Sequence, residues 1–141
     1  MYAEAMNEYY GPNEDSYYYL NKIRNRAGLP KIEEIWSNAS IVKTPGKHLT
    51  QEGLREIIRH ERAIELSFEG HQYDDQRRWK TAENEYSTPL LGCDSSKEEI
   101  SDFYKLRILQ NRKWNTPRDY LTPLSNKTLN QNRNLTQNPG W

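Results

Sequence analysis

Apolar side chains recur at helical spacing in the segment that follows Thr50. The residues at this spacing are Leu54, Ile57, Ile58, Ile64 and Phe68. Positions three and four apart lie on one face of an α-helix, so this pattern predicts a helix with one buried side. Thr50 has the side chain of a helix N-cap, and Gly70 is suited to end the helix. The sequence therefore predicts a helix from Thr50 to Gly70.

A second helix is predicted from Glu14 to Ala27. Acidic residues stand in its first turn and basic residues toward its end, which suits the helix dipole. Gly28 is a natural residue for the left-handed position after a helix, and Pro30 prevents continuation. The predicted buried face consists of Ser16, Leu20, Ile23 and Ala27.

The remaining pattern predicts shorter elements. Residues 2–10 form one short helix, and the break after it leads to Asn13 as an N-cap. Residues 31–49 form an irregular connection with one turn near Ile32 to Trp36. Another helical stretch is expected from Tyr73 to Ala82. Two successive helix pairs, about 2–28 and 50–82, suit a helix-turn-helix solenoid in which each unit covers its neighbour's apolar face.

Residues 83–141 are predicted to be irregular. Residues 87–96 contain Pro, Gly and Ser, and Ser95 or Ser96 is expected to cap a short helix through residues 98–100. The segment 114–141 has three prolines and many Asn and Gln residues, which indicates an extended tail. The side chains expected to hold this tail are Tyr120, Leu121, Leu124, Leu129, Leu135 and Trp141.

Composition narrows the possible classes of protein. Only 34% of the residues are apolar and the mean hydropathy is -1.12, whereas 11% are aromatic, which argues against disorder. Twenty basic and twenty acidic residues cancel, so nucleic acid is not expected as a partner. No apolar run reaches the length of a membrane span, and no signal peptide follows Met1. If Met1 is an expression start, targeting information has been removed.

Three glutamates, Glu61, Glu65 and Glu69, fall on the apolar side of the predicted 50–70 helix. Carboxylates in such a place require charged partners, which predicts a structural ion-pair network. The expected partners are Arg24, Arg26, Arg62, Arg77 and Arg78. The alternative is a pair of glycosidase carboxylates. Residues four apart on one helix point the same way, whereas hydrolysis requires carboxyl groups on both sides of a bond, so the structural interpretation is favoured.

Other catalytic or metal-binding patterns are absent from the sequence. His60 with Glu61 lacks the second histidine of a zinc-protease helix, because position 64 is Ile, and neither His48 nor His71 restores a ligand spacing. Cys93 is the single cysteine, which excludes an intrachain disulfide or a zinc knuckle. The glycines form no phosphate-binding loop. No cofactor and no metal are expected.

Tryptophan side chains are the remaining candidates for ligand contact, because indole faces stack on sugar rings. Trp36 and Trp114 fall in predicted loops, where an aromatic side chain is more easily spared from the core. Packing is the favoured interpretation even for these two. Trp79 and Trp141 are expected to anchor structure.

Three blocks of the sequence resemble one family. Residues 19–30, Tyr-Leu-Asn-Lys-Ile-Arg-Asn-Arg-Ala-Gly-Leu-Pro, resemble the Asn-x-Ile-Arg-x-Arg-Ala-Gly-Leu signature of the SusD/RagB proteins of Bacteroidetes. Residues 61–73, followed by Asp75, Arg77, Arg78 and Trp79, resemble that family's Glu-Arg-x-x-Glu-Leu-x-Phe-Glu-Gly-x-Arg-Tyr-x-Asp-x-Arg-Arg-Trp block. Residues 120–141, ending in Gln-Asn-Pro-Gly-Trp, are similar to its C-terminal ending. The sequence departs from the family pattern at Gln72, Asp74, Gln76, Ser125 and Arg133.

The resemblance implies an all-α fold of tetratricopeptide-like helix pairs with long irregular loops and an extended C-terminal tail. It also implies a lipid-anchored outer-membrane protein that captures glycans or peptides and covers a SusC-like TonB-dependent transporter. Family members are several times longer, so residues 1–141 are expected to be a C-terminal portion without the lipidated residue. In the best-known sugar binders of the family, the ligand-contacting aromatics come mostly from a central region outside residues 1–141, so the resemblance assigns no ligand-binding residue here. Asp75 is expected to join the ion-pair network. A tetratricopeptide-type scaffold and a glycoside hydrolase using Glu61 and Glu65 are the alternatives.

Overall fold

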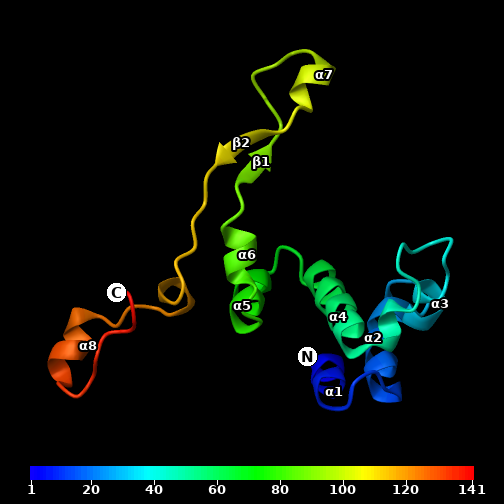
Figure 1. Ribbon diagram of the computed structural model, residues 1–141, viewed down its shortest axis with the longest axis horizontal. Helices are drawn as coiled ribbons and strands as arrows, with labels where there is room; N and C mark the ends of the chain where they lie inside the picture. The colour runs from blue at the N-terminus through cyan, green and yellow to red at the C-terminus, as the bar shows by residue number, and fades with distance from the viewer. The chain divides into compact units, whose positions relative to one another are not determined.

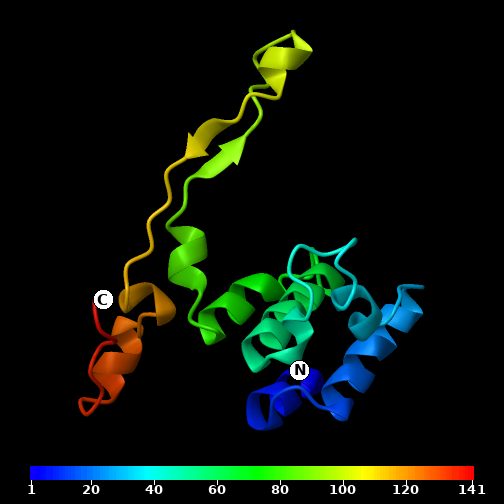
Figure 2. The ribbon, with the colours of Figure 1, turned by 45° about the vertical axis from the view of Figure 1, so that its right-hand side comes forward.

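The computed structural model describes residues 1–141 and divides the chain into two compact units, Met1–Gly70 and His71–Trp141. The regular elements of the first unit are all helices (Figure 1). Its elements are α1 (Tyr2–Tyr10), α2 (Glu14–Arg26), α3 (Ile32–Trp36), the 3-10 turn η1 (Lys47–Leu49) and α4 (Gln51–Glu65). Helix α1 packs against both α2 and α4, as Figure 2 shows.

The core of the first unit is small and joins all four α-helices. Its buried apolar side chains are Ala3, Leu20, Ile32, Leu54, Ile57 and Ile58. Tyr17 and Trp36 pack against this cluster from its edge. Leu20 from the face predicted for residues 14–27 therefore meets Leu54, Ile57 and Ile58 from the predicted 50–70 helix in one core. Ile23 and Ala27 were predicted on the same face as Leu20, but both are exposed.

Local signals fix three helix ends as predicted. The Asn13 side chain accepts a hydrogen bond from the Ser16 N–H at 3.0 Å and caps α2. At the C-terminal end of α2, Gly28 has a φ of 70°, in the left-handed region. This conformation turns the backbone so that the Leu29 N–H donates to the Arg24 carbonyl oxygen at 2.9 Å. The Thr50 hydroxyl accepts a hydrogen bond from the Gly53 N–H at 3.1 Å and caps the start of α4.

The prediction that the helix after Thr50 extends to Gly70 is wrong, because α4 ends at Glu65. The backbone then turns tightly, and Phe68 and Gly70 both have positive φ values, of 66° and 80°, which a helix does not allow. Phe68 is consequently fully exposed, and Ile64 is 59% exposed. Neither side chain belongs to the buried stripe on which the sequence pattern placed it.

Polar side chains hold the helices of the first unit together. The Asn7 side chain donates to the Gln51 carbonyl oxygen at 2.9 Å, and the Gln51 side chain donates back to the Asn7 carbonyl oxygen at 2.8 Å. Asn21 accepts from the Ile32 N–H at 2.9 Å and donates to Glu33 at 2.8 Å. These amides satisfy backbone groups at the end of α1 and at the starts of α3 and α4.

The second unit consists of short helices and one β-hairpin that extends away from α5 and α6 (Figures 1 and 2). Its elements are α5 (His71–Arg78), α6 (Ala82–Tyr86), β1 (Leu90–Gly92), α7 (Ile100–Phe103), β2 (Arg107–Gln110), the 3-10 turn η2 (Arg118–Tyr120) and α8 (Asn126–Gln131). The strands are antiparallel, with Leu91 opposite Ile108 and an irregularity between Leu90 and Leu91.

Several predictions for residues 71–141 require correction. The stretch expected at 73–82 is divided, because Lys80 has a φ of 60° and interrupts the helical backbone between α5 and α6. The short helix expected at 98–100 lies at Ile100–Phe103 without a side-chain cap, since Ser96 hydrogen-bonds to Asp94 instead. The hairpin and α8 were not predicted. The chain as a whole is nevertheless mostly helical, which confirms the all-α, tetratricopeptide-like class. None of the helices combines the length and apolar character required to cross a membrane.

Candidate functional site

Two arginines of α2 contact two glutamates of α4. Arg24 pairs with Glu61, and Arg26 pairs with Glu65. The first pair is largely buried, with 9% of the Arg24 side chain and 16% of the Glu61 side chain exposed. Arg24 also donates through Nε to the Pro30 carbonyl oxygen at 2.7 Å. The contact therefore links α4, α2 and the turn after α2.

Other members of the expected network lie in different places. Glu69 stands beyond the end of α4, so the prediction that it shares a helix face with Glu61 is wrong. Arg62 lies within α4 itself. In the second unit Arg78 pairs with Asp75 of the same helix at 2.9 Å. Arg77 instead donates to the Tyr120 carbonyl oxygen at 2.6 Å.

Glu61 and Glu65 border a cavity of about 190 Å³ in the first unit, where Leu20, Ile23 and Ile58 form much of the wall. Both carboxylates come from the same helix and both are engaged by arginine. A glycosidase requires two carboxyl groups on opposite sides of a sugar bond, one of them carrying a proton. This cavity does not have that arrangement.

The histidines do not converge. His48 is buried, whereas His60 and His71 are exposed on different helices. Three or more His, Cys, Asp or Glu side chains placed to hold a metal ion are not found together. Cys93 is free and half-buried.

The second unit contains a cavity of about 500 Å³ with aromatic walls. Segments from α5, α6, the chain after β2 and the C-terminus contribute to it. Its lining residues are Tyr73, Arg77, Tyr86, Arg112, Lys113, Trp114, Asp119, Leu121, Thr122, Pro123 and Trp141.

Trp114 stands at the centre of the aromatic cluster in this cavity. Its ring stacks on Tyr86, with centroids 5.6 Å apart and an interplanar angle of 23°. The Tyr120 ring meets Trp114 edge-on, with centroids 5.0 Å apart, and the centroid of the Tyr73 ring lies 6.4 Å from that of Trp114. Burial raises the pKa of the Tyr86 hydroxyl above its ordinary value.

Trp141 forms another part of the wall and is half exposed. Its indole N–H donates to the carbonyl oxygens of Arg118 and Leu121, each at 3.1 Å. The Arg118 guanidinium lies 5.1 Å from the ring centroid, at cation–π distance. These contacts hold the indole in one orientation while leaving much of its surface open.

The polar groups of the cavity are mainly hydrogen-bond donors. Asp119 accepts from Arg118 Nε at 2.7 Å and from the Asn115 N–H at 2.7 Å, and these bonds lower the pKa of its carboxyl group. Trp114 Nε1 and Arg77 Nε are buried donors without an acceptor. The cavity is thus richer in donors than in free acceptors.

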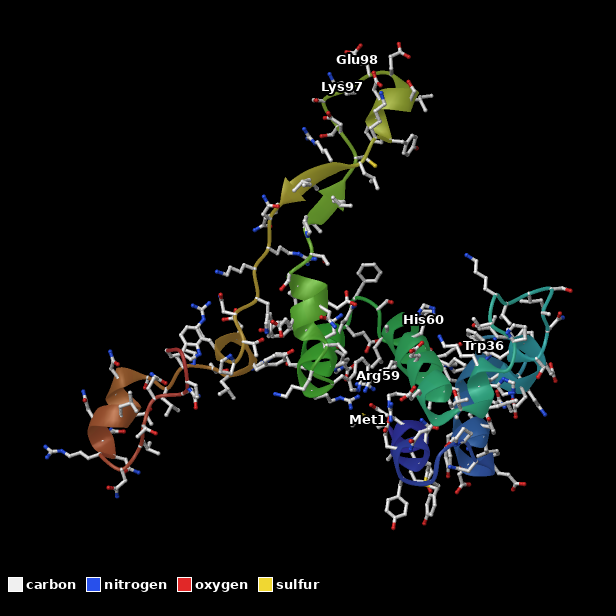
Figure 3. The ribbon with its side chains drawn as sticks, in the orientation of Figure 1. Met1, Trp36, Arg59, His60, Lys97 and Glu98 are labelled. Carbon is white, nitrogen blue, oxygen red and sulfur yellow. The ribbon has the colours of Figure 1, made fainter.

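The two tryptophans singled out from the sequence occupy different environments. Trp36 ends α3 rather than lying in a loop, packs against the core, and has Lys47 Nζ 5.5 Å from its ring centroid (Figure 3). Trp114 lines the aromatic cavity. Sequence reasoning missed Tyr73, Tyr86 and Trp141 as cavity residues. Their proximity arises from the folding of segments far apart in the chain, for which no local pattern gives a signal.

Comparison with known proteins identifies the family. The profile of the SusD family matches residues 1–141. SusD-like protein P2 of Formosa agariphila is 34% identical over 140 residues, which cover 99% of this chain and 23% of that protein. The crystal structure of a SusD-like protein from Bacteroides fragilis, also 34% identical, superposes with a TM-score of 0.72 over 99% of this chain and 23% of that chain. The chain thus spans under a quarter of the length of these relatives, and it belongs to the SusD family.

Proposed function

We propose that the protein carrying this chain captures glycans, or peptides, at the bacterial outer membrane and passes them to a SusC-like TonB-dependent transporter. It binds its ligand without chemical conversion and is held at the membrane by a lipid anchor. Membership of the SusD family supports this nutrient-binding role. The structural observation that carries the proposal is the aromatic cavity of the second unit.

The cavity has the composition of a sugar-binding surface. Indole and phenol rings supply flat apolar faces, and hydrogen-bonding groups around them interact with hydroxyls. Trp141 is fixed by two carbonyl oxygens and is half exposed, so it can stack on a ring without first being ordered. Trp114 and Tyr86 form the wall beside it.

The first unit has a structural role in this proposal. Glu61 and Glu65 are bound by arginines and join α4 to α2, which leaves capture to the second unit. The proposal therefore assigns no catalytic residue. Replacing Glu61 with Gln should lower the stability of the protein and leave ligand affinity unchanged.

Isothermal titration of the protein against a panel of neutral and acidic oligosaccharides and peptides tests the proposal. We expect binding to at least one class and co-purification with an outer-membrane transporter. Absence of binding across the panel, together with capture of a soluble protein partner, would support a tetratricopeptide-type scaffold instead. Turnover of an oligosaccharide that is lost in Glu61→Gln and Glu65→Gln would support a hydrolase.

A further inference from the structure

The aromatic cavity carries an excess of positive charge. Arg77, Arg112 and Lys113 line it, whereas Asp119 is the single acidic side chain in its wall. Asp119 is already matched by Arg118, whose Nε donates to it at 2.7 Å. Three cationic side chains therefore face the cavity without a compensating acidic side chain from its lining.

None of these three cations forms an ion pair with another side chain of residues 1–141. Arg112 donates to the carbonyl oxygens of Glu85 and Thr88 at 3.0 and 2.9 Å, and Arg77 donates to the Tyr120 carbonyl oxygen. Carbonyl oxygens orient a guanidinium without neutralising its charge. The buried Nε of Arg77 has no hydrogen-bond acceptor. Lys113 is exposed at the edge of the same cavity.

Grouped cations of this kind are unfavourable unless an anion reaches them. Like charges repel, and most arginines near a carboxylate pair with it, as Arg118 does here. A cleft lined by one sign of charge also concentrates ligands of the opposite sign. The charge pattern thus points to a ligand that brings negative charge into an aromatic site.

We propose that this cavity binds an acidic sugar unit of an oligosaccharide, through the carboxylate of a uronic acid or a sulfate ester. The inference rests on the proposed function and specifies its ligand class. The sugar ring stacks on Trp141, and the acidic group faces Arg112, Arg77 and Lys113. A carboxylate is planar and a sulfate ester is tetrahedral, but both present a pair of oxygens that can accept two hydrogen bonds from a guanidinium.

Titration of the protein with three tetrasaccharides tests the inference. The probes are tetragalacturonate, a sulfated carrageenan tetrasaccharide and neutral maltotetraose, each measured at low and high NaCl. We expect at least one acidic probe to bind about tenfold more tightly than maltotetraose, and this advantage to shrink in high salt because ions screen exposed charges. Preference for only one acidic probe identifies the carboxylate or the sulfate as the recognised group.

Lys113→Gln is the decisive variant, because Lys113 makes no hydrogen bond that the fold requires. Loss of one exposed cation should weaken the acidic probes about threefold more than it weakens maltotetraose. Lys97→Gln is the matched control, since Lys97 is exposed at the far end of the hairpin (Figure 3). Arg112→Lys keeps the positive charge but removes the guanidinium that can donate two parallel hydrogen bonds. This variant should weaken the binding of acidic probes more than Lys113→Gln does.

The outcomes separate the two proposals. Equal binding of acidic and neutral probes, or identical behaviour of Lys113→Gln and Lys97→Gln, overturns the acidic-sugar inference while glycan capture stands. Failure of every oligosaccharide and peptide to bind overturns both. Thermal unfolding of each variant identifies any loss of affinity that comes from misfolding.

Discussion

Arg24 of α2 and Glu61 of α4 form a largely buried ion pair across two helices, and the same guanidinium binds the Pro30 carbonyl oxygen at 2.7 Å. One side chain thus fixes the angle between two helices and the turn that ends the first. Removing either partner leaves the other charge buried and uncompensated, which is costly.

Arg24→Ala or Glu61→Gln should therefore lower the free energy of unfolding by about 3 to 5 kcal/mol. The matched control is Arg26→Ala, because the Arg26 side chain is 70% exposed and its pair with Glu65 should contribute at most about 1 kcal/mol. Chemical denaturation of the single and double variants measures the coupling. Additive effects of Arg24→Ala and Glu61→Gln would contradict the assigned contact.

Asn21→Ala should destabilise the start of α3. The side chain of Asn21 accepts a hydrogen bond from the buried Ile32 N–H at 2.9 Å, and its loss leaves that donor unsatisfied. The expected cost is about 1 to 3 kcal/mol. Asn25→Ala, at an exposed position one turn later on the same helix, is the control and should have little effect. Equal melting temperatures for both variants would disprove this role.

Gly53→Ala should lower stability although alanine favours helices. A methyl group at Gly53 would lie 1.9 Å from the Lys47 carbonyl oxygen, which is part of the backbone and has little freedom to move. Overpacking of this kind costs about 1 to 3 kcal/mol. Glu52→Ala, at the exposed neighbouring position, serves as the control in thermal unfolding. A rise in melting temperature for Gly53→Ala would contradict the close approach of η1 to α4.

Glu8 of α1 and Arg55 of α4 should make stability depend on pH. Both guanidinium nitrogens Nε and Nη2 donate to the carboxylate, at 2.5 and 2.6 Å, and these bonds lower the pKa of Glu8 in the folded protein. Because the pKa of Glu8 is lower in the folded than in the unfolded protein, the pair stabilises the fold fully above the unfolded pKa. This stabilisation is lost as the pH falls through the folded pKa. Because the pair is exposed, the loss is at most about 1 kcal/mol. Melting curves between pH 7 and pH 3 should show a smaller decline for Glu8→Gln than for the unchanged protein, and parallel declines would refute the link.

Local signals in the sequence predicted the first unit better than the second. Asn13, Gly28 and Thr50 act within a few residues of their own positions, so their roles can be read from the sequence alone. The end of α4 could not be read in this way, because periodic apolar residues continue to Phe68 after the helical backbone has stopped. The hairpin likewise lacks an alternating polar and apolar pattern, since its side chains are mostly exposed on both faces.

The candidate site was predicted only in part. Trp114 stood out as a loop aromatic, but its neighbours Tyr73 and Trp141 lie far away in sequence and reach it through the folding of the second unit. The excess of cations around it was hidden by the overall balance of charge in the chain. Such a surplus is visible only when the partners of each arginine and lysine are known.

Isothermal titration of Trp141→Ala against the best oligosaccharide ligand tests the central claim most directly. The apolar contact between a sugar ring and the indole should contribute about 1 kcal/mol or more, so the variant should bind at least about fivefold more weakly. Tyr104→Ala is the matched control, because Tyr104 is an exposed aromatic residue of the same unit outside the cavity, and it should bind as the unchanged protein does. Unchanged affinity in a correctly folded Trp141→Ala protein would contradict the assignment of ligand capture to this cavity.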